Sequence, residues 1–248
     1  MKKLLILGDP KGTHAITALR KYNAEDITVW ENDSRHIYTI KQIDGRINVT
    51  TDLQELVDKG MKFDVVIGNP PYGNRGSLAV QFLNKSLELS DDVRMILPLS
   101  FTKPSITNQV SLNHICVDEI ELPETTFPNG IKAVRQRWIP SDTPRQKIIL
   151  PTSHSDFEFV KYEERFDADL MIGAVGSGPS GKVKTENFTH YQPKHHFIKC
   201  KSEEIKNRLI SLQPILRELS KQQNGRGGVC KSDIVTHYVN SLEGVAPE

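Results

Sequence analysis

The first 140 residues alternate short apolar runs with segments in which apolar residues recur at helical spacing. The apolar runs predict strands at residues 3–7, 27–30, 46–50, 63–67 and 93–97. The segments between them predict helices at residues 13–22, capped by Thr13, and at 34–42, 53–59 and 78–89. Two more strands, at 117–122 and 132–139, are expected to close the pattern. This alternation predicts an α/β fold of βαβ units around a parallel sheet, which binds ligands at the carboxyl ends of its strands.

The chain changes character after Pro140. Pro140, Pro144 and Pro151 punctuate a stretch that we interpret as a linker, because proline interrupts both helices and central strands. The sequence therefore predicts two domains, a larger one at residues 1–150 and a small C-terminal region at 151–248.

Patterning within the C-terminal region is weaker. A strand is expected at 157–162 and one helix at 203–219. The segment 171–182 is rich in glycine, and we expect no regular structure there. The tail from 222 to 248 carries little pattern of either kind.

A rigid polar segment, Asn69-Pro70-Pro71-Tyr72, directly follows the fourth predicted strand. Two successive prolines fix φ near −65° and hold the backbone rigid. The side-chain carbonyl of Asn69 and the backbone carbonyl of Pro70 can then accept both hydrogens of one NH2 group, while Tyr72 offers a flat face to an aromatic ring. Two acceptors favour a tetrahedral nitrogen with an available lone pair. The segment therefore predicts chemistry on an amino group, which needs orientation and charge placement but no metal.

Composition narrows the class of protein. With 37% hydrophobic and 25% charged residues, the 248-residue chain has the composition of a globular protein. No run approaches the roughly 20 apolar residues of a membrane helix, and the apolar run near the start is too short for a signal peptide. We therefore expect a cytoplasmic protein that does not enter a membrane. The three cysteines show no metal-ligand spacing, and we expect no metal site.

Charge is distributed unevenly along the chain. Residues 1–130 carry 14 Lys and Arg against 17 Asp and Glu, whereas residues 131–248 carry 18 against 14. A basic second half suits contact with phosphates. The cations expected to bind substrate are Lys182, Lys184 and Lys194, which stand among further basic and aromatic residues: His190, Tyr191, His195, His196, Phe197 and Lys199. A solvated strand with ordinary charges is the alternative interpretation of this mixture.

The run from Phe63 to Gly73, with Asn69–Tyr72 at its centre, resembles the catalytic motif of amino-methyltransferases, especially N6-adenine DNA methyltransferases of the gamma order, known from phages and bacterial restriction-modification. The resemblance covers about residues 3–140. It implies a Rossmann-like fold that binds S-adenosylmethionine in 1–150 and recognises its target in 151–248. It also implies that Asn69, Pro70, Pro71 and Tyr72 catalyse methyl transfer to the N6 amine of adenine in DNA. A base in a duplex would first be flipped out.

The same resemblance implies a set of residues for S-adenosylmethionine. Residues 7–13 occupy the place of the family's Gly-rich loop, although Gly8 stands where the family has an acidic residue and His14 where it has a second glycine. Glu31 is expected on the ribose hydroxyls, and Asp52 on the adenine amine of the cofactor. The full set is Leu7, Gly8, Gly12, Thr13, Glu31, Asn32, Asp52 and Asn69. Phe127, before the last strand of the sheet, is expected on the far face of the target base, with a core position as the alternative.

Other acceptors and roles stay open. RNA adenine methyltransferases and glutamine N5-methyltransferases share the Asn-Pro-Pro-Tyr segment, and a retired, nucleic-acid-binding subunit is a further alternative. The partner expected is a nucleic acid, DNA before RNA. The sequence also leaves room for a homo-oligomer or a partner subunit, which could supply the segment that covers the cofactor in the family.

Overall fold

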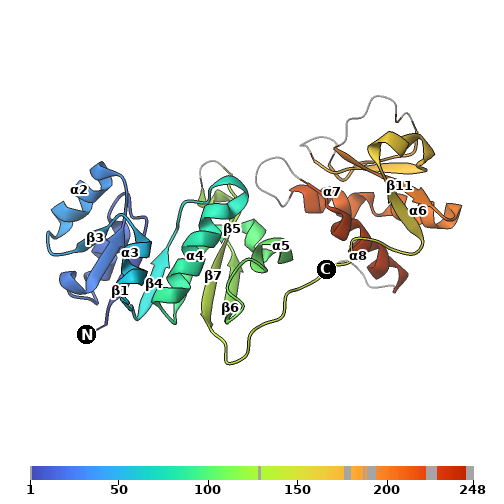
Figure 1. Cartoon of the computed structure of the whole chain (residues 1–248). Helices are drawn as coiled ribbons and strands as arrows, with labels where there is room; N and C mark the ends of the chain where they lie inside the picture. The colour runs from blue at the N-terminus through green and yellow to red at the C-terminus, as the bar shows by residue number, and fades with distance from the viewer. Residues whose placement is uncertain are drawn as a thin grey trace. The chain divides into compact units, whose positions relative to one another are not determined.

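The structure is a computed structural model, and it describes residues 2–127, 130–175, 180–186, 188, 194–221 and 228–243, apart from the side chain of Arg75. The chain divides into two compact units, residues 1–148 and 149–248 (Figure 1). Each unit has its own sheet and its own core. The two are described separately below.

The N-terminal unit is built on a seven-stranded sheet with the order β3-β2-β1-β4-β5-β7-β6. Its strands are β1 (Leu4–Leu7), β2 (Ile27–Trp30), β3 (Asn48–Thr50), β4 (Val65–Gly68), β5 (Val93–Pro98), β6 (His114–Glu121) and β7 (Ala133–Pro140). Strands β1 to β5 pair in parallel, and β7 runs antiparallel to both of its neighbours. The predicted fold class, a Rossmann-like methyltransferase sheet, is confirmed by this architecture.

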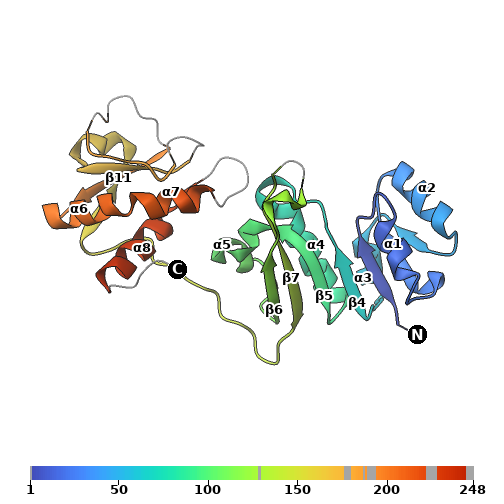
Figure 2. The ribbon, with the colours of Figure 1, turned by 180° about the vertical axis from the view of Figure 1, so that it is seen from behind.

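Helices lie on both faces of this sheet (Figure 2). They are α1 (Thr13–Ala18), α2 (Ser34–Ile43), α3 (Leu53–Asp58), α4 (Ser77–Leu89) and α5 (Pro104–Thr107), with short 3-10 turns η1 (Ala24–Asp26), η2 (Asn74–Gly76), η3 (Leu99–Thr102) and η4 (Glu124–Thr126). Alternate residues of β1 enter two different cores. Leu4 and Ile6 pack with α1 and α2, whereas Leu5 and Leu7 pack with α3 and α4. A strand buried on both faces reads as an unbroken apolar run, which is why the sequence pattern located it.

The C-terminal unit has a four-stranded antiparallel sheet with the order β10-β9-β11-β8. Its elements are β8 (Phe157–Val160), the 3-10 turn η5 (Tyr162–Asp167), β9 (Leu170–Gly173), β10 (Val183–Lys184), β11 (His195–Cys200), α6 (Glu203–Ser211), α7 (Gln213–Lys221) and α8 (Lys231–Leu242). One face of the sheet packs on the three helices, through residues such as Ile172, Ile198 and Leu216. This unit therefore buries a core of its own.

Three expectations for the second unit are wrong. The glycine-rich segment 171–182 was expected to be irregular, but Met171–Gly173 belong to β9, buried between β10 and β11. The single helix expected at 203–219 is two helices, because Pro214 has no N–H and fits only the first turn of α7. The tail expected to be weakly patterned contains α8, whose Ile234, Val235 and Tyr238 are buried.

In the N-terminal unit the differences concern element ends, together with helix α5 and the short 3-10 turns, which were not predicted. The helix expected to reach residue 22 ends at Ala18, and the strand expected from residue 46 begins at Asn48. Within the described ranges, no helix combines the length and the apolar character that crossing a membrane requires.

Candidate active site

The segments singled out from the sequence meet at one edge of the seven-stranded sheet. Strands β3, β2, β1 and β4 are adjacent and parallel, so the residues that follow them share the carboxyl edge. Backbone hydrogen bonds continue each strand into its loop: Glu31 N–H donates to Thr50 O (3.0 Å), Gly8 N–H to Trp30 O (3.1 Å) and Asn69 N–H to Leu7 O (3.2 Å). Topology therefore brings together the loops expected to hold the cofactor and the loop expected to catalyse.

Gly8 marks the close approach of two of these loops. Its φ is +69°, and a Cβ there would lie 3.3 Å from the backbone oxygen of Asn69. Gly12 is more constrained, with φ +68° and a Cβ position only 2.1 Å from Ile43 Cδ1. Both positions have a left-handed backbone, which glycine adopts without strain.

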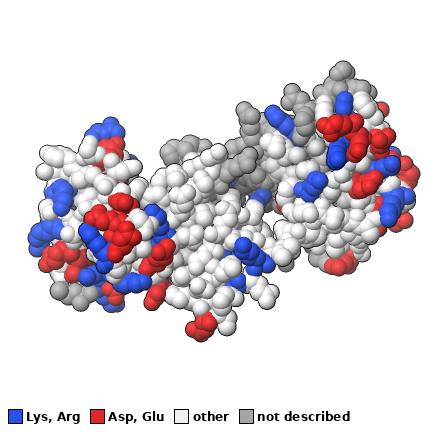
Figure 3. Space-filling model, viewed as in Figure 1, with Lys and Arg blue, Asp and Glu red and all other residues white. Residues whose placement is uncertain are grey.

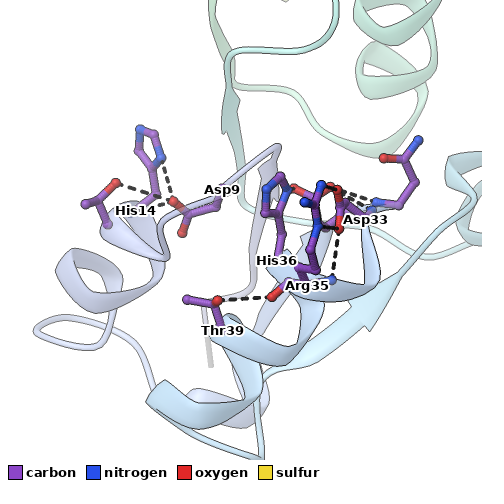
Figure 4. A network of polar contacts seen from close by, with 9 residues as sticks. Asp9, His14, Asp33, Arg35, His36 and Thr39 are labelled. Carbon is purple, nitrogen blue, oxygen red and sulfur yellow. Dashed lines mark hydrogen bonds and ion pairs between the residues drawn. The ribbon is translucent and has the colours of Figure 1, made fainter.

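Asp9 anchors the cofactor-loop candidate, a role that the sequence analysis missed. Its fully buried carboxylate accepts hydrogen bonds from the backbone N–H groups of Ala15 (2.8 Å) and His14 (3.1 Å) at the start of α1, and lies 3.2 Å from His14 Nδ1 (Figure 4). The expectation that Thr13 caps this helix is wrong: its hydroxyl donates to Asp9 (3.4 Å), and Asp9 satisfies the amides. The acidic side chain sought at Gly8 is thus present one position later. The signal that could have found it was the Asp-Pro turn directly after a buried strand.

Asp9 and His14 shift each other's ionisation. Burial alone would raise the pKa of Asp9, but the hydrogen bonds from His14 and from the amides of α1 outweigh it and lower that pKa. The hydrogen bond to Asp9 raises the pKa of His14. The hydrogen bond to Asp9 thereby holds the half-exposed imidazole of His14 at the start of α1. This is the position where the sequence analysis noted a departure from the family's second glycine.

Glu31 is buried, and it holds the turn after β2. Its Oε1 accepts from the backbone N–H groups of Asn32 (2.9 Å) and Asp33 (3.1 Å), and its Oε2 lies 3.4 Å from His36 Nδ1. Asp33 also caps α2 and binds Arg35 through both carboxylate oxygens (Figure 4). The carboxylate of Glu31 is therefore fixed at the sheet edge, while the neighbouring Asn32 is exposed.

Asp52 stands beside a small cavity with aromatic walls. As the N-cap of α3 it accepts the N–H of Gln54 (2.8 Å), and it is exposed. The cavity, of about 170 Å³, is lined by Trp30, Thr51, Asp52, Leu53, Gln81, Phe82 and Lys85. Trp30 meets Phe82 edge-on at 4.6 Å, and its indole N–H donates to Thr51 O (3.0 Å). Two rings with a carboxylate at the rim suit a flat heterocycle that carries an amine.

The Asn69–Tyr72 segment contains two polar atoms that are buried without a hydrogen-bond partner among the described residues, Asn69 Oδ1 and the Tyr72 hydroxyl. Each costs about 1–3 kcal/mol in folding free energy unless a ligand or water satisfies it. The Tyr72 ring is half-buried against the core, and burial raises the pKa of Tyr72 to about 12. Gly73, with φ +67°, turns the chain away directly after it.

Phe127 lies on the same edge of the sheet by topology. Strand β6 is parallel to β5, since both are antiparallel to β7, so the β6–β7 connection stands on the side of Asn69. Phe127 follows η4 and is half-buried. Lys132 O in this connection accepts the N–H of Leu99, which ties it to the loop after β5 (3.1 Å).

The structure separates the basic residues of the C-terminal unit into groups. Lys182 and Lys194 are exposed and flank the end of β9, since their backbone oxygens accept from Gly173 N–H and Ala174 N–H (both 3.0 Å). Lys184 is half-buried in β10. Lys199 lies at the opposite end of β11, paired in register with Glu158 on β8. Lys182 and Lys194 therefore lie at the same end of this sheet, and Lys199 lies at the other.

Phe197 is not free to stack on a base, contrary to the mixture of rings expected there. It is 2% exposed and packs with Met171 and Phe188 on the face of the sheet away from α6, α7 and α8. His196 is turned to the opposite face, where its Nε2 lies 2.8 Å from Val229 O. His190 and Tyr191 lie outside the described residues.

The described surface also differs in charge between regions. In the view of Figure 3, the surface over α4 and α5 carries few charged side chains, whereas both signs are interspersed over the C-terminal unit. No cluster of three or more His, Cys, Asp or Glu within the described ranges is arranged to hold a metal ion.

Comparison with known proteins matches the first part of the chain to one family. Residues 9–114 match the model of the family described as Eco57I restriction-modification methylase. The matched range contains Asp9, Glu31, Asp52 and the Asn69–Tyr72 segment. The resemblance to an amino-methyltransferase family is therefore confirmed. No curated protein matches the chain.

Several solved structures are similar to somewhat more than half of this chain at low sequence identity. TrmN from Thermus thermophilus is 14% identical, with a TM-score of 0.46 over 56% of this chain and 44% of that chain. A dimethyladenosine transferase from Plasmodium falciparum is 16% identical, with a TM-score of 0.42 over 57% of this chain and 56% of that one. A ribosomal protein L11 methylase from Lactobacillus delbrueckii subsp. bulgaricus is 11% identical, with a TM-score of 0.42 over 56% and 69%.

Proposed function

We propose that this chain transfers a methyl group from S-adenosylmethionine to the exocyclic N6 amine of adenine in a nucleic acid, DNA before RNA. The observation that carries the proposal is the buried Oδ1 of Asn69, at the carboxyl edge of a methyltransferase sheet, which has no hydrogen-bond partner among the described residues. A hydrogen-bond acceptor is normally satisfied when it is buried. An incoming amine would satisfy this one, so the loop is suited to bind an NH2 donor.

The catalytic contribution of the loop is orientation. The lone pair of an adenine amine is delocalised into the ring, and hydrogen bonds from its two protons to Asn69 Oδ1 and Pro70 O return it to the nitrogen. Oδ1 has no solvent contact, so binding requires rotation of the Asn69 amide about χ2, a broad and soft torsion. Asn69 as a residue is only partly buried, which leaves that rotation room. Once rotated, an acceptor fixed at the reacting nitrogen lowers the barrier to transfer without any metal.

The residues at the edge fit S-adenosylmethionine, which supplies a methyl group on a positively charged sulfur when bound. The cavity lined by Trp30 and Phe82, whose rings contact each other edge-on, can accept a flat base against this aromatic wall, and Asp52 at its rim can accept from the base's amine. Glu31, fixed at the end of the neighbouring strand, is placed to bind ribose hydroxyls through Oε2. The loop from Gly8 to Thr13, anchored by Asp9, then faces the remaining, amino-acid end. Leu7, Gly12 and Asn32 complete the proposed set.

A nucleic-acid acceptor is supported by the C-terminal unit. Lys182 and Lys194 are exposed cations at one end of its sheet, as contact with phosphates requires. We propose that this unit recognises the target, with Lys184 beside them, and that Phe127 covers the second face of the base. The family description, restriction-modification methylase, favours DNA over RNA and over a glutamine amide.

A retired, binding-only subunit is the competing function. Asn69 Oδ1, which has no hydrogen-bond partner among the described residues, destabilises the fold. In a protein without turnover this cost would bring no functional benefit, and an apolar side chain of similar size would avoid it. The intact Asn69–Tyr72 segment therefore favours an active enzyme.

The test is methyl transfer from labelled S-adenosylmethionine to duplex DNA, single-stranded DNA, RNA and protein side by side. The parental protein should label adenine in DNA, and Asn69→Ala should lose about 10²–10³ in rate. Its affinity for the cofactor should change far less, because Asn69 is only one of eight residues expected to bind it and its main expected contact is with the target amine. Asn48→Ala, at the amino edge of the same sheet, is the matched control and should keep the parental rate. Transfer at the parental rate by Asn69→Ala would defeat the catalytic assignment. If only RNA or only protein is labelled, the proposed acceptor, adenine in DNA, is wrong and the labelled molecule takes its place.

A further inference from the structure

The catalytic loop is backed by a second loop, η3, which follows β5. A Cβ placed on Gly76, at the end of η2, would lie 3.6 Å from both Phe101 Cε2 and Ser100 Oγ of η3. Gly76 is also the N-cap of α4, whose Ala79 N–H donates to the backbone oxygen of Tyr72 (3.4 Å). Gly76 therefore stands between η3 and the helix start that bonds to the end of the Asn69–Tyr72 segment.

The buried side chain of Gln136 binds the backbone of η3. Gln136, on β7, is 1% exposed, and its Nε2 donates to Phe101 O (3.3 Å) and to Glu119 Oε2 on β6 (2.5 Å). Its Oε1 accepts the indole N–H of Trp138 (3.0 Å). A flipped amide would set two donors against each other at Trp138 and oxygens against oxygens at the other two contacts. All three contacts are therefore satisfied in one orientation only.

The central position of Gln136 is unusual for its strand. Its neighbours on the same face of β7 are Val134 and Trp138, both in the apolar core. An amide among them costs free energy unless it is fully bonded, and an apolar residue would pack there without that requirement. What the amide adds is a direct bond to the main chain of η3, from a strand that is itself paired on both sides.

We propose that Gln136 is a positioning residue for the transfer reaction, which fixes η3 and through it the Asn69–Tyr72 loop. The inference rests on the proposed function for its effect on turnover, but not for its effect on the loop. Gln136 touches neither substrate nor cofactor in this account. Its loss should reduce kcat and leave cofactor affinity almost unchanged, because the cofactor loops after β1, β2 and β3 lie on the other side of β4.

The experiment uses a pair of exchanges that separate positioning from stability. Gln136→Glu keeps the shape and the acceptor for Trp138, but it removes the donor to Phe101 O and sets two carboxylates against each other at Glu119. Adding Glu119→Gln restores a donor–acceptor pair between the two strands without restoring the bond to Phe101. The double variant should therefore regain the part of the lost thermal midpoint that comes from the repulsion at Glu119. Glu119→Gln alone is the matched control, since its amide oxygen can still accept from Gln136.

Two measurements decide the outcome. Turnover should fall about tenfold or more in both Gln136→Glu and the double variant, with the cofactor Kd within about twofold of the parental value, because small misplacements at a reacting centre are costly in rate. Amide hydrogen exchange should be faster in peptides covering residues 73–77 and 99–103, and unchanged across β1 to β3.

Recovery of kcat together with the midpoint in the double variant would overturn the proposal, since Gln136 would then act on stability alone. Unchanged exchange at 73–77 in Gln136→Glu would overturn it as well. A parental protein that methylates no acceptor would count against the proposed function only, because the exchange measurement needs no turnover.

Discussion

Removal of the Tyr72 hydroxyl should make the protein more stable and leave it active. The hydroxyl is buried and has no hydrogen-bond partner among the described residues, while the ring packs against the main core. Tyr72→Phe keeps the ring, its packing and the face offered to the target base. It removes only the group that folding takes out of water without compensation.

The size of the effect follows from that desolvation. An unsatisfied buried hydroxyl costs about 1–3 kcal/mol, so Tyr72→Phe should raise the free energy of unfolding by an amount in that range. For a unit of this size, each kcal/mol corresponds to roughly 2–4 °C in thermal midpoint. The direction is opposite to that of most substitutions in a core, which makes the prediction distinctive.

The gain should also depend on pH in a defined window. Burial raises the pKa of Tyr72 to about 12, so the folded state favours the neutral phenol. Because the unfolded Tyr72 ionises near pH 10 and the folded one only near 12, the parental protein keeps its full stability below pH 10 and loses part of it as the pH rises toward 12. The difference between Tyr72→Phe and the parental protein should therefore grow above pH 10. Comparing the two proteins cancels the titration of the other tyrosines.

Urea unfolding at pH 7 measures the gain in the free energy of unfolding, and unfolding between pH 10 and 12 measures its pH dependence. Tyr22→Phe is the control at a second half-buried tyrosine. A Tyr72→Phe protein that is less stable than the parental one at pH 7 would refute the reasoning. It would mean that the hydroxyl is satisfied by an ordered water or by a group that moves toward it. Methyl transfer should stay within a few-fold of the parental rate, because the stacking face is kept.

Three further predictions concern the cofactor, the substrate and pH. Glu31→Ala and Asp52→Ala should each weaken S-adenosylmethionine binding about tenfold or more by calorimetry, through loss of a charge-assisted hydrogen bond; unchanged affinity in both would remove them from the site. Lys182→Ala and Lys194→Ala should each lower the salt slope of DNA binding by about one, and a parental slope in both would move the phosphate contacts elsewhere. The raised pKa of His14 adds stability below pH 6.5 that is lost as the pH rises through the folded value, so His14→Ala should flatten the stability profile there; an identical profile would show that the imidazole contributes nothing.

The sequence located the parallel half of the sheet well because its strands are buried on both faces. Strand β2 was predicted to the residue, and α2 and α4 to within one residue at each end. The Asn69–Tyr72 segment was found because its chemistry is local: four adjacent residues and one preceding strand define it. The match of residues 9–114 to a methylase family confirms the family resemblance, while the roles of these four residues stay predictions.

What the sequence did not reveal depends on partners distant along the chain. Asp9 looked like part of a turn, since its bonds to the amides of α1 are visible only when the loop is folded. Strand β9 is held by two antiparallel neighbours despite its glycine-rich continuation, so tertiary pairing overrode local propensity. Gln136 gave no signal at all, because an amide inside an apolar strand acquires meaning only through Phe101, from another element.

If Asn69 orients the target amine as proposed, its Oδ1, which has no hydrogen-bond partner among the described residues, sets folding and turnover in opposition at one position. An apolar side chain of similar volume there would relieve a cost of about 1–3 kcal/mol and end the reaction at the same time. Selection for a stable fold alone would thus discard the asparagine, and only selection for turnover would retain it. In a lineage of this chain that no longer transfers methyl groups, position 69 is expected to change before Pro70 and Pro71, whose rigidity benefits the fold in either case.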